Sequence, residues 1–173
     1  DLNKKTINSF KNMSLSSGFV FIVQFITTLI LARIFSPNEF GIITAITIVT
    51  NYTDIFWEIG IGPALIQKKN LYQKDIDTGF TTSLVLGIII TIIVVFSSPI
   101  LANMINIGNH IILQVISISF VINSLGVVPL SLLQRDMQFG VIIKKDIISN
   151  LVYTFCAMIL GIIGLKVWAL VIA

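Results

Sequence analysis

Two carboxylates in an otherwise apolar stretch are the residues of this sequence best placed to do chemistry. The stretch SPNEFGIITAITIVTNYTDIFWEIGIGPALIQ, residues 36–67, carries Asp54 and Glu58 among isoleucines and aromatic residues. At about 100° per residue, both acids fall on one face of a helix, which also carries Thr44, Thr47 and Asn51. Acids inside a membrane-spanning helix are costly and usually mark a pathway for ions or substrate, so this face is a candidate pathway or gate.

Their depth leaves a second interpretation open. At about 1.5 Å per residue, Asp54 lies roughly 26 Å along the helix from Pro37, which is past the middle of a hydrocarbon core of about 30 Å. Both acids could therefore reach the membrane surface and form structural ion pairs with Arg135 or Lys144. The sequence alone does not choose between an ion pair and a transport site.

The preceding apolar run adds two further candidates. Gln24 is a large amide deep in the run and is a candidate for lining a cavity, although polar residues also hydrogen-bond across packed helices. Arg33 either anchors the end of the run at the membrane surface or faces a cavity, where its guanidinium would suit a phosphate. The candidate pathway or gating residues are thus Gln24, Arg33, Asn51, Asp54 and Glu58.

Metal, cofactor and enzymatic motifs are missing from the sequence. His110 stands alone, and the single Cys156 excludes an intrachain disulfide or a CxxC site. No Walker loop, GxSxG motif or dinucleotide fingerprint occurs. We therefore predict no cofactor, no metal and no enzymatic activity.

Composition identifies an integral membrane protein. Hydrophobic residues make up 55% of the chain and charged residues 11%, against about 25% charged in soluble domains. The mean hydropathy is +0.99. The net charge of +3 is interpreted as a topology signal, and no nucleic-acid partner is predicted.

The apolar runs predict an all-α, polytopic helical membrane protein with five complete transmembrane helices and the start of a sixth. Glycines and Pro63 should end or kink the second helix, Pro99 should close the third, and Pro129 should kink the fourth. Small-residue stripes on the third and fifth helices are interpreted mainly as packing surfaces. The predicted helices cover residues of about 12–35, 37–62, 78–98, 111–133, 147–165 and 168 onward, in one amino-terminal lobe over 1–173 that belongs to a longer chain.

The distribution of cations predicts the orientation. Lys and Arg accumulate in cytoplasmic loops, and here one side of the predicted membrane carries far more of them than the other. The N-terminus is therefore predicted to be cytoplasmic. The richer side holds Lys4, Lys5, Lys11, Lys68, Lys69, Lys74, Arg135, Lys144 and Lys145, and the other side holds Arg33 and Lys166.

Four segments resemble a known family. ARIFSPNEFGIITA, EIGIGPALIQKK, SLLQRDMQF and VWALV, in this order and spacing, are similar to the amino-terminal half of bacterial polysaccharide exporters. These are lipid-linked oligosaccharide flippases of the O-antigen or teichuronic-acid type, within the multidrug/oligosaccharidyl-lipid/polysaccharide exporter superfamily. The family usually has Asp at the position of Glu58, and its cavity arginines have no clustered counterpart here.

The resemblance implies the first lobe of a two-lobe exporter in the bacterial cytoplasmic (inner) membrane. It implies a polyprenyl-diphosphate-linked oligosaccharide as cargo, alternating access as mechanism, and an ion gradient of H⁺ or Na⁺ as driving force. Partners would be the lipid bilayer, the lipid-linked glycan and polysaccharide assembly proteins. Two alternatives remain open: a cation-coupled drug or metabolite antiporter of the same superfamily, in which Asp54 binds the ion, and a membrane-embedded glycosyltransferase or polymerase.

Overall fold

The computed structural model describes residues 18, 21–33, 35–104, 109–165 and 167–172, without the side chains of residues 49 and 52–59. All regular secondary structure in these ranges is helical, as predicted. Three of the described helices are long and apolar enough to cross a membrane, namely α4 (Gln73–Met104), α5 (Ile111–Arg135) and α6 (Phe139–Ile162). The predicted total of five complete spans and the start of a sixth stays a prediction.

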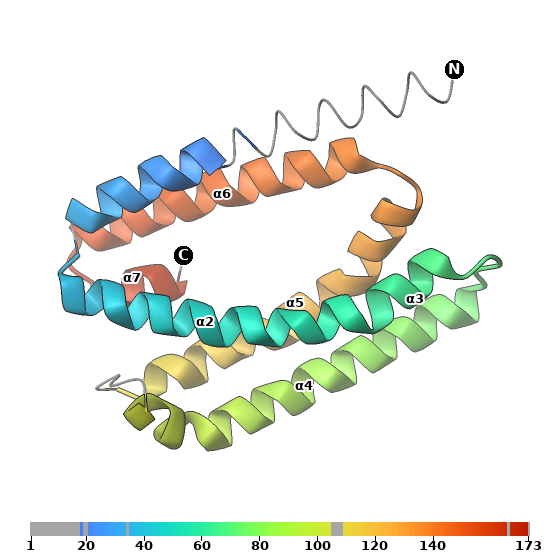
Figure 1. Cartoon of the computed structure of the whole chain (residues 1–173), viewed down its shortest axis with the longest axis horizontal. Helices are drawn as coiled ribbons and strands as arrows, with labels where there is room; N and C mark the ends of the chain where they lie inside the picture. Colours follow the sequence, from blue (N-terminus) through green and yellow to red (C-terminus); the bar gives the residue numbers. More distant parts are fainter. Residues whose placement is uncertain (1–17, 19–20, 34, 105–108, 166, 173) are drawn as a thin grey trace. The chain divides into compact units, whose positions relative to one another are not determined.

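The chain forms two compact units (Figure 1). Unit 1 comprises Asp1–Phe40 with Met137–Ala173, and unit 2 comprises Gly41–Asp136. Helix α2 (Pro37–Ile59) begins in unit 1 and continues into unit 2. Each unit is described by itself below.

In unit 1, the N-terminal helix Phe21–Arg33 packs against α6, and α7 (Val167–Ile172) follows α6 (Figure 1). The core of unit 1 contains two fully buried alanines, Ala157 and Ala169. Their small side chains allow the helices to approach closely. Leu31 and Phe35 fill the space beside these alanines. The predicted packing role of the stripe on residues 147–165 is therefore confirmed at Ala157.

The start of α2 is capped by local interactions. Ser36 is the N-cap of α2: its backbone N–H and its hydroxyl donate to one carboxylate oxygen of Glu39 at 2.8 and 2.9 Å, and its hydroxyl accepts from the N–H of Glu39 at 3.4 Å. This reciprocal arrangement is a capping box, which satisfies N–H groups that have no partner within the helix. The predicted start of this helix at residue 37 is confirmed.

The end of α6 shows why its last predicted residues are not helical. Gly164 has φ +88, and its N–H donates to the carbonyl of Gly161 at 3.0 Å, while Leu165 donates to Leu160 at 3.2 Å. These two bonds form a Schellman motif, in which glycine takes the left-handed conformation without a steric penalty. The helix therefore ends at Ile162, and Gly164 belongs to the cap rather than to the packing stripe.

Unit 2 is built on α4 and α5, which lie side by side in an antiparallel pair (Figure 1). A line of small residues on each helix is buried between them: Ser83, Gly87 and Ser98 on α4, and Ser117, Ser124 and Ser131 on α5. A Cβ atom added to Gly87 would lie 2.8 Å from both Cβ and Oγ of Ser124. The predicted packing role of the stripe on residues 78–98 is therefore confirmed.

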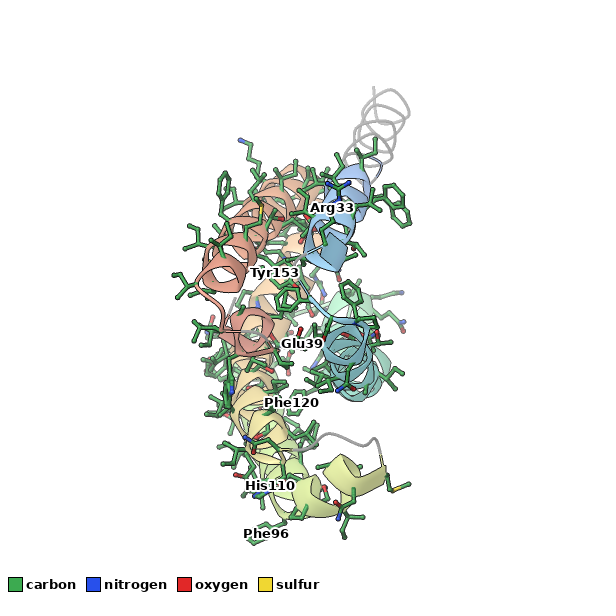
Figure 2. The ribbon with its side chains drawn as sticks, turned by 90° about the vertical axis from the view of Figure 1, so that its left-hand side faces the viewer. Arg33, Glu39, Phe96, His110, Phe120 and Tyr153 are labelled. Carbon is green, nitrogen blue, oxygen red and sulfur yellow. The ribbon has the colours of Figure 1, made fainter. Side chains whose placement is uncertain are left out.

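Aromatic side chains distinguish the inner and outer surfaces of this pair. Phe120 of α5 is 1% exposed, whereas Phe96 of α4 is 81% exposed (Figure 2). Hydrogen bonds also cross the interface, because Thr91 donates to the carbonyl of Ser117 at 2.9 Å and Gln114 donates to Oγ of Ser98 at 3.2 Å. The two helices thus combine close backbone approach with polar contacts, as membrane helices commonly do.

Pro99 does not close its helix, contrary to the prediction. It lies inside α4, which continues to Met104. A proline within a helix leaves the carbonyl four residues earlier without its usual donor. Here that carbonyl belongs to Val95, and it accepts a hydrogen bond from the hydroxyl of Ser98 at 2.8 Å. The hydroxyl replaces the missing N–H, so the helix passes through the proline.

Helix starts also differ from the predictions. Helix α4 begins at Gln73 rather than at about residue 78, since the carboxylate of Asp75 accepts from the N–H of Tyr72 at 3.1 Å and caps the helix within the polar segment. Helix α6 begins at Phe139 rather than at about residue 147, so it includes most of the residues between the predicted fourth and fifth helices. The predicted break after α2 is confirmed: α2 ends at Ile59, and the short helix α3 (Ile61–Gln67) contains Pro63 in its first turn.

Candidate functional site

The predicted residues of unit 1 lie on opposite faces of one helix. Gln24 and Arg33 are both exposed on the N-terminal helix. They are nine positions apart in the sequence, which at about 100° per residue places them roughly half a turn from each other. The buried face of this helix is instead marked by Thr27, whose hydroxyl lies 2.9 Å from that of Thr154 on α6. By the same spacing, Gln24 lies on the side of the helix that carries Thr27 and the buried Leu31, yet its own side chain is exposed, and it does not share a surface with Arg33.

The predicted residues of unit 2 lie on α2. Thr44, Thr47 and Asn51 are exposed in this unit, so the polar face of α2 is not used for packing at these positions. The hydroxyl of Thr47 donates to the carbonyl of Ile43 at 2.9 Å, within its own helix. Asp54 and Glu58 lie within α2, but their side chains are outside the described part of the structure. The exposed polar face of α2 thus continues as far as Asn51.

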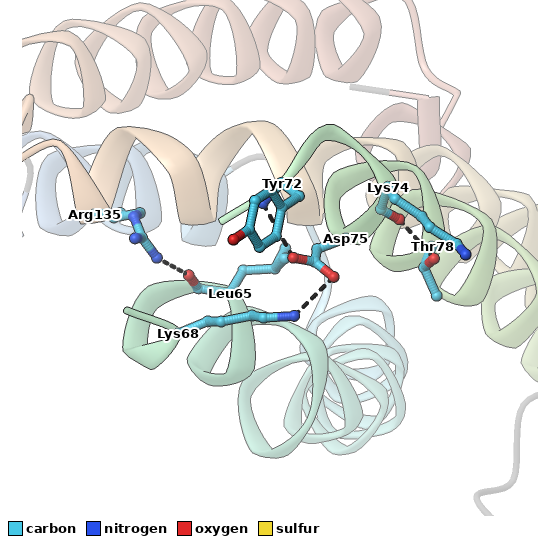
Figure 3. A network of polar contacts seen from close by, with 7 residues as sticks. All are labelled: Leu65, Lys68, Tyr72, Lys74, Asp75, Thr78 and Arg135. Atoms are coloured by element: carbon cyan, nitrogen blue, oxygen red, sulfur yellow. Dashed lines mark hydrogen bonds and ion pairs between the residues drawn. The ribbon is translucent and has the colours of Figure 1, made fainter. Parts of the chain in front are cut away.

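Arg135 holds a position that the sequence did not predict. Its guanidinium donates to the carbonyl of Leu65 at 2.6 Å (Figure 3). It also donates to the carbonyls of Lys69 at 3.2 Å and Ile66 at 3.5 Å. These are carbonyls at and just after the end of α3, where a helix leaves its last carbonyls without partners. Arg135 therefore caps α3 with a forked, charged donor and ties it to the end of α5.

The predicted ion pairing of Glu58 with Arg135 or Lys144 stays a prediction. The side chain of Glu58 is not described, and Lys144 is exposed on α6 in the other unit. The observed partners of Arg135 are backbone carbonyls. A sequence signal for this contact existed, since α3 ends without a glycine cap and needs an outside donor for its carbonyls.

The segment between α3 and α4 is stabilised by its own side chains (Figure 3). Nζ of Lys68 lies 2.7 Å from Oδ1 of Asp75, so an ion pair closes the turn. The hydroxyl of Thr78 donates to the carbonyl of Lys74 at 2.6 Å. Leu65 is buried, and its Cδ1 would lie 3.3 Å from a Cβ added to Gly79, so α3 packs closely on α4. Arg135, α3 and the start of α4 thus form one junction, which we call the α3–α4 junction (residues 65–78 with Arg135).

The described part of the chain gathers no metal-binding cluster of three or more His, Cys, Asp or Glu side chains. The chemistry available at the described polar positions is hydrogen bonding and charge interaction. Such groups suit the recognition of a polar or anionic molecule, and they need no covalent step.

Comparison with known proteins identifies the family. A family described as "Polysaccharide biosynthesis protein" matches residues 30–173, which is most of the chain. The chain belongs to this family. The resemblance recognised in the sequence is therefore confirmed.

Individual relatives agree with this assignment. The chain is 28% identical over 94% of its length to an "Uncharacterized membrane protein in cps region" of Klebsiella pneumoniae, covering 34% of that protein. It is 26% identical over 86% of its length to the "Teichuronic acid biosynthesis protein TuaB" of Bacillus subtilis, covering 31%. It is 27% identical over 98% of its length to the "Succinoglycan biosynthesis transport protein ExoT" of Rhizobium meliloti, covering 35%.

The chain spans about a third of the length of the curated relatives that it matches. No solved structure matches it.

Proposed function

We propose that the protein moves a polyprenyl-diphosphate-linked oligosaccharide across the bacterial cytoplasmic membrane during the biosynthesis of a surface polysaccharide. The observation that carries this proposal is the similarity along nearly the whole chain to a relative named as a transport protein of succinoglycan biosynthesis. The family match over residues 30–173 supports the link to polysaccharide biosynthesis. Three helices able to cross a membrane support a location in the bilayer.

The proposed mechanism is alternating access, in which helical bundles rock against each other around a central pathway. Such motion requires helix pairs that move as rigid bodies, and the tightly packed contact between α4 and α5 supports this requirement. Transport of this kind breaks no covalent bond. A gradient of H⁺ or Na⁺ is the proposed energy source, with the cytoplasmic N-terminus supported by the distribution of lysines and arginines.

In this proposal, Gln24, Asn51, Asp54 and Glu58 line or gate the cytoplasmic half of the pathway. The exposure of Gln24 and Asn51 supports this role, because neither is used for packing within its unit. Arg33 is proposed to attract the diphosphate of the cargo, since its exposed guanidinium suits phosphate oxygens. Polar side chains at membrane depth are tolerated where they face a water-filled cavity.

The function is tested by deleting the gene in its native host. We expect loss of the surface polysaccharide and accumulation of the lipid-linked glycan in the inner leaflet, both reversed by the full-length gene. The same strains are assayed for drug efflux. Unchanged polysaccharide together with lost drug efflux would replace the proposal by the antiporter alternative, and lost synthesis of the lipid-linked glycan itself would favour a glycosyltransferase.

The pathway residues are tested by single cysteine substitutions at Gln24, Asn51, Asp54 and Glu58 in a full-length protein with Cys156 replaced by alanine. A water-soluble thiol reagent should label each position, and labelling should change when cargo is present. Phe96→Cys is the control, because its side chain is 81% exposed on the outside of an apolar span and should face lipid. If the four positions resist labelling as strongly as the control in every condition, the pathway assignment is wrong.

A further inference from the structure

The cations at the α3–α4 junction fall into two groups. Arg135 and Lys68 have partners: the guanidinium binds carbonyls, and Nζ of Lys68 pairs with Asp75. The ammonium groups of Lys69 and Lys74 are exposed, and they make no hydrogen bond or ion pair with the described residues. The junction therefore presents two exposed lysines without a direct ion pair among the described residues, and Asp75 acts on Lys74 only as a nearby charge.

The backbone of both lysines is held in place. The carbonyl of Lys69 accepts from Arg135 at 3.2 Å, and the carbonyl of Lys74 accepts from the hydroxyl of Thr78 at 2.6 Å. Figure 3 shows the side chain of Lys74 extending away from the pair formed by Lys68 and Asp75. The nearby carboxylate of Asp77 accepts from the side-chain amide of Gln73 at 3.0 Å. The junction is thus a backbone held by hydrogen bonds that carries exposed cationic side chains.

The junction lies where a membrane surface is expected. Helix α4 has 32 residues, which at about 1.5 Å per residue exceeds a hydrocarbon core of about 30 Å, so its polar first turn reaches past the core. Helix α5 ends at Arg135 at the same end of the antiparallel pair. Tyr72 is 65% exposed between the two lysines, and tyrosine is enriched at the level of lipid headgroups.

We propose that Lys69, Tyr72 and Lys74 form a binding surface for the headgroups of anionic phospholipids. The charge is complementary, because exposed lysines next to a membrane span attract anionic lipids, and the tyrosine ring fits the interface between headgroups and acyl chains. Arg135 and the pair of Lys68 with Asp75 are positioning groups that hold this surface at the correct depth. The proposal concerns the lipid around the protein and does not depend on which molecule is transported.

The test uses the full-length protein in nanodiscs of phosphatidylglycerol and phosphatidylcholine. The measured quantity is the relative association of a spin-labelled phosphatidylglycerol over the matching phosphatidylcholine. Lys69→Gln and Lys74→Gln should each lower this preference about fivefold, and high salt should weaken it in the unsubstituted protein. Tyr72→Ala should lower it less, because it removes no charge.

Lys145→Gln is the matched control, since it removes the same charge from a lysine whose Nζ lies 2.9 Å from the carboxylate of Asp146. It should leave the preference nearly unchanged. An equal effect of Lys145→Gln, or no effect of Lys69→Gln and Lys74→Gln, would overturn the proposal. Displacement of the labelled lipid by inorganic phosphate at constant ionic strength would also overturn it, because the site would then bind free phosphate rather than a lipid surface.

Discussion

Replacing Gly87 with alanine should lower the free energy of unfolding of the full-length protein by about 1–3 kcal/mol, the usual cost of overpacking a close interface. The new Cβ would lie 2.8 Å from Cβ of Ser124 and 3.1 Å from the carbonyl oxygen of Phe120. Cβ and the carbonyl belong to rigid parts of α5, so the two helices must move apart. Unfolding by SDS titration of the purified protein in micelles measures the change.

Gly126→Ala is the control for this experiment. Gly126 lies on α5, and a Cβ added there would have no neighbour within 4 Å. It should leave stability unchanged or raise it slightly, because alanine is the better helix former. Ser124→Gly should restore part of the loss in Gly87→Ala by removing the colliding atoms. A Gly87→Ala protein as stable as the Gly126→Ala protein would show that α4 and α5 are not packed as described.

Replacing Arg135 with alanine should lower the free energy of unfolding by about 1–2 kcal/mol, towards the low end for charged hydrogen bonds because the side chain is only half-buried. The carbonyls of Leu65 and Lys69 would lose their donor. The loss should be local, so hydrogen exchange should speed up in α3 and at the start of α4 before the rest of unit 2.

A second variant at Arg135 separates the shape of the guanidinium from its charge, and a substitution at another arginine is the control. Arg135→Lys should retain only a minor part of the stability that Arg135→Ala loses, because a single ammonium cannot bind the carbonyls of Leu65 and Lys69 at once as the two guanidinium nitrogens do. Arg33→Ala is the matched control, since Arg33 is exposed and makes no hydrogen bond or ion pair among the described residues. Exchange in α3 that is unaffected by Arg135→Ala would contradict the capping role.

The sequence predicted the helical class, the small-residue packing and the start of α2, because each depends on patterns within one segment. Ser36 and Glu39 are three residues apart, which is the spacing of a capping box. The serine, glycine and alanine stripes follow the helical period, and they mark close packing whatever the partner helix is.

The predicted helix bounds and caps were wrong or incomplete where a side chain supplies a hydrogen bond that the backbone lacks. Pro99 normally ends a helix, but the hydroxyl of Ser98 supplies the donor that the proline lacks. The carboxylate of Asp75 caps the start of α4 within a polar segment that resembles a loop. The cap of α3 by Arg135 joins residues far apart in the sequence: the missing glycine cap indicates that a donor is needed, but no local pattern identifies Arg135 as that donor.

The candidate pathway could be predicted only as a set of helix faces. Helical periodicity placed Thr44, Thr47 and Asn51 on one face of α2, and all three are exposed there. Gln24 was proposed to line a cavity, and its side chain is exposed, although Thr27, three residues later, contacts α6. How such faces meet depends on contacts between helices, which periodicity does not specify.

The buried serines of α4 and α5 have a consequence for the order of assembly. Ser83, Ser117 and Ser124 each donate their hydroxyl to a carbonyl one turn earlier in the same helix. Their donors are therefore satisfied in a single helix that is still surrounded by lipid, before any partner is present. Each helix can therefore enter the bilayer alone. Helices α4 and α5 can pack together afterwards through their small residues, without breaking these hydrogen bonds.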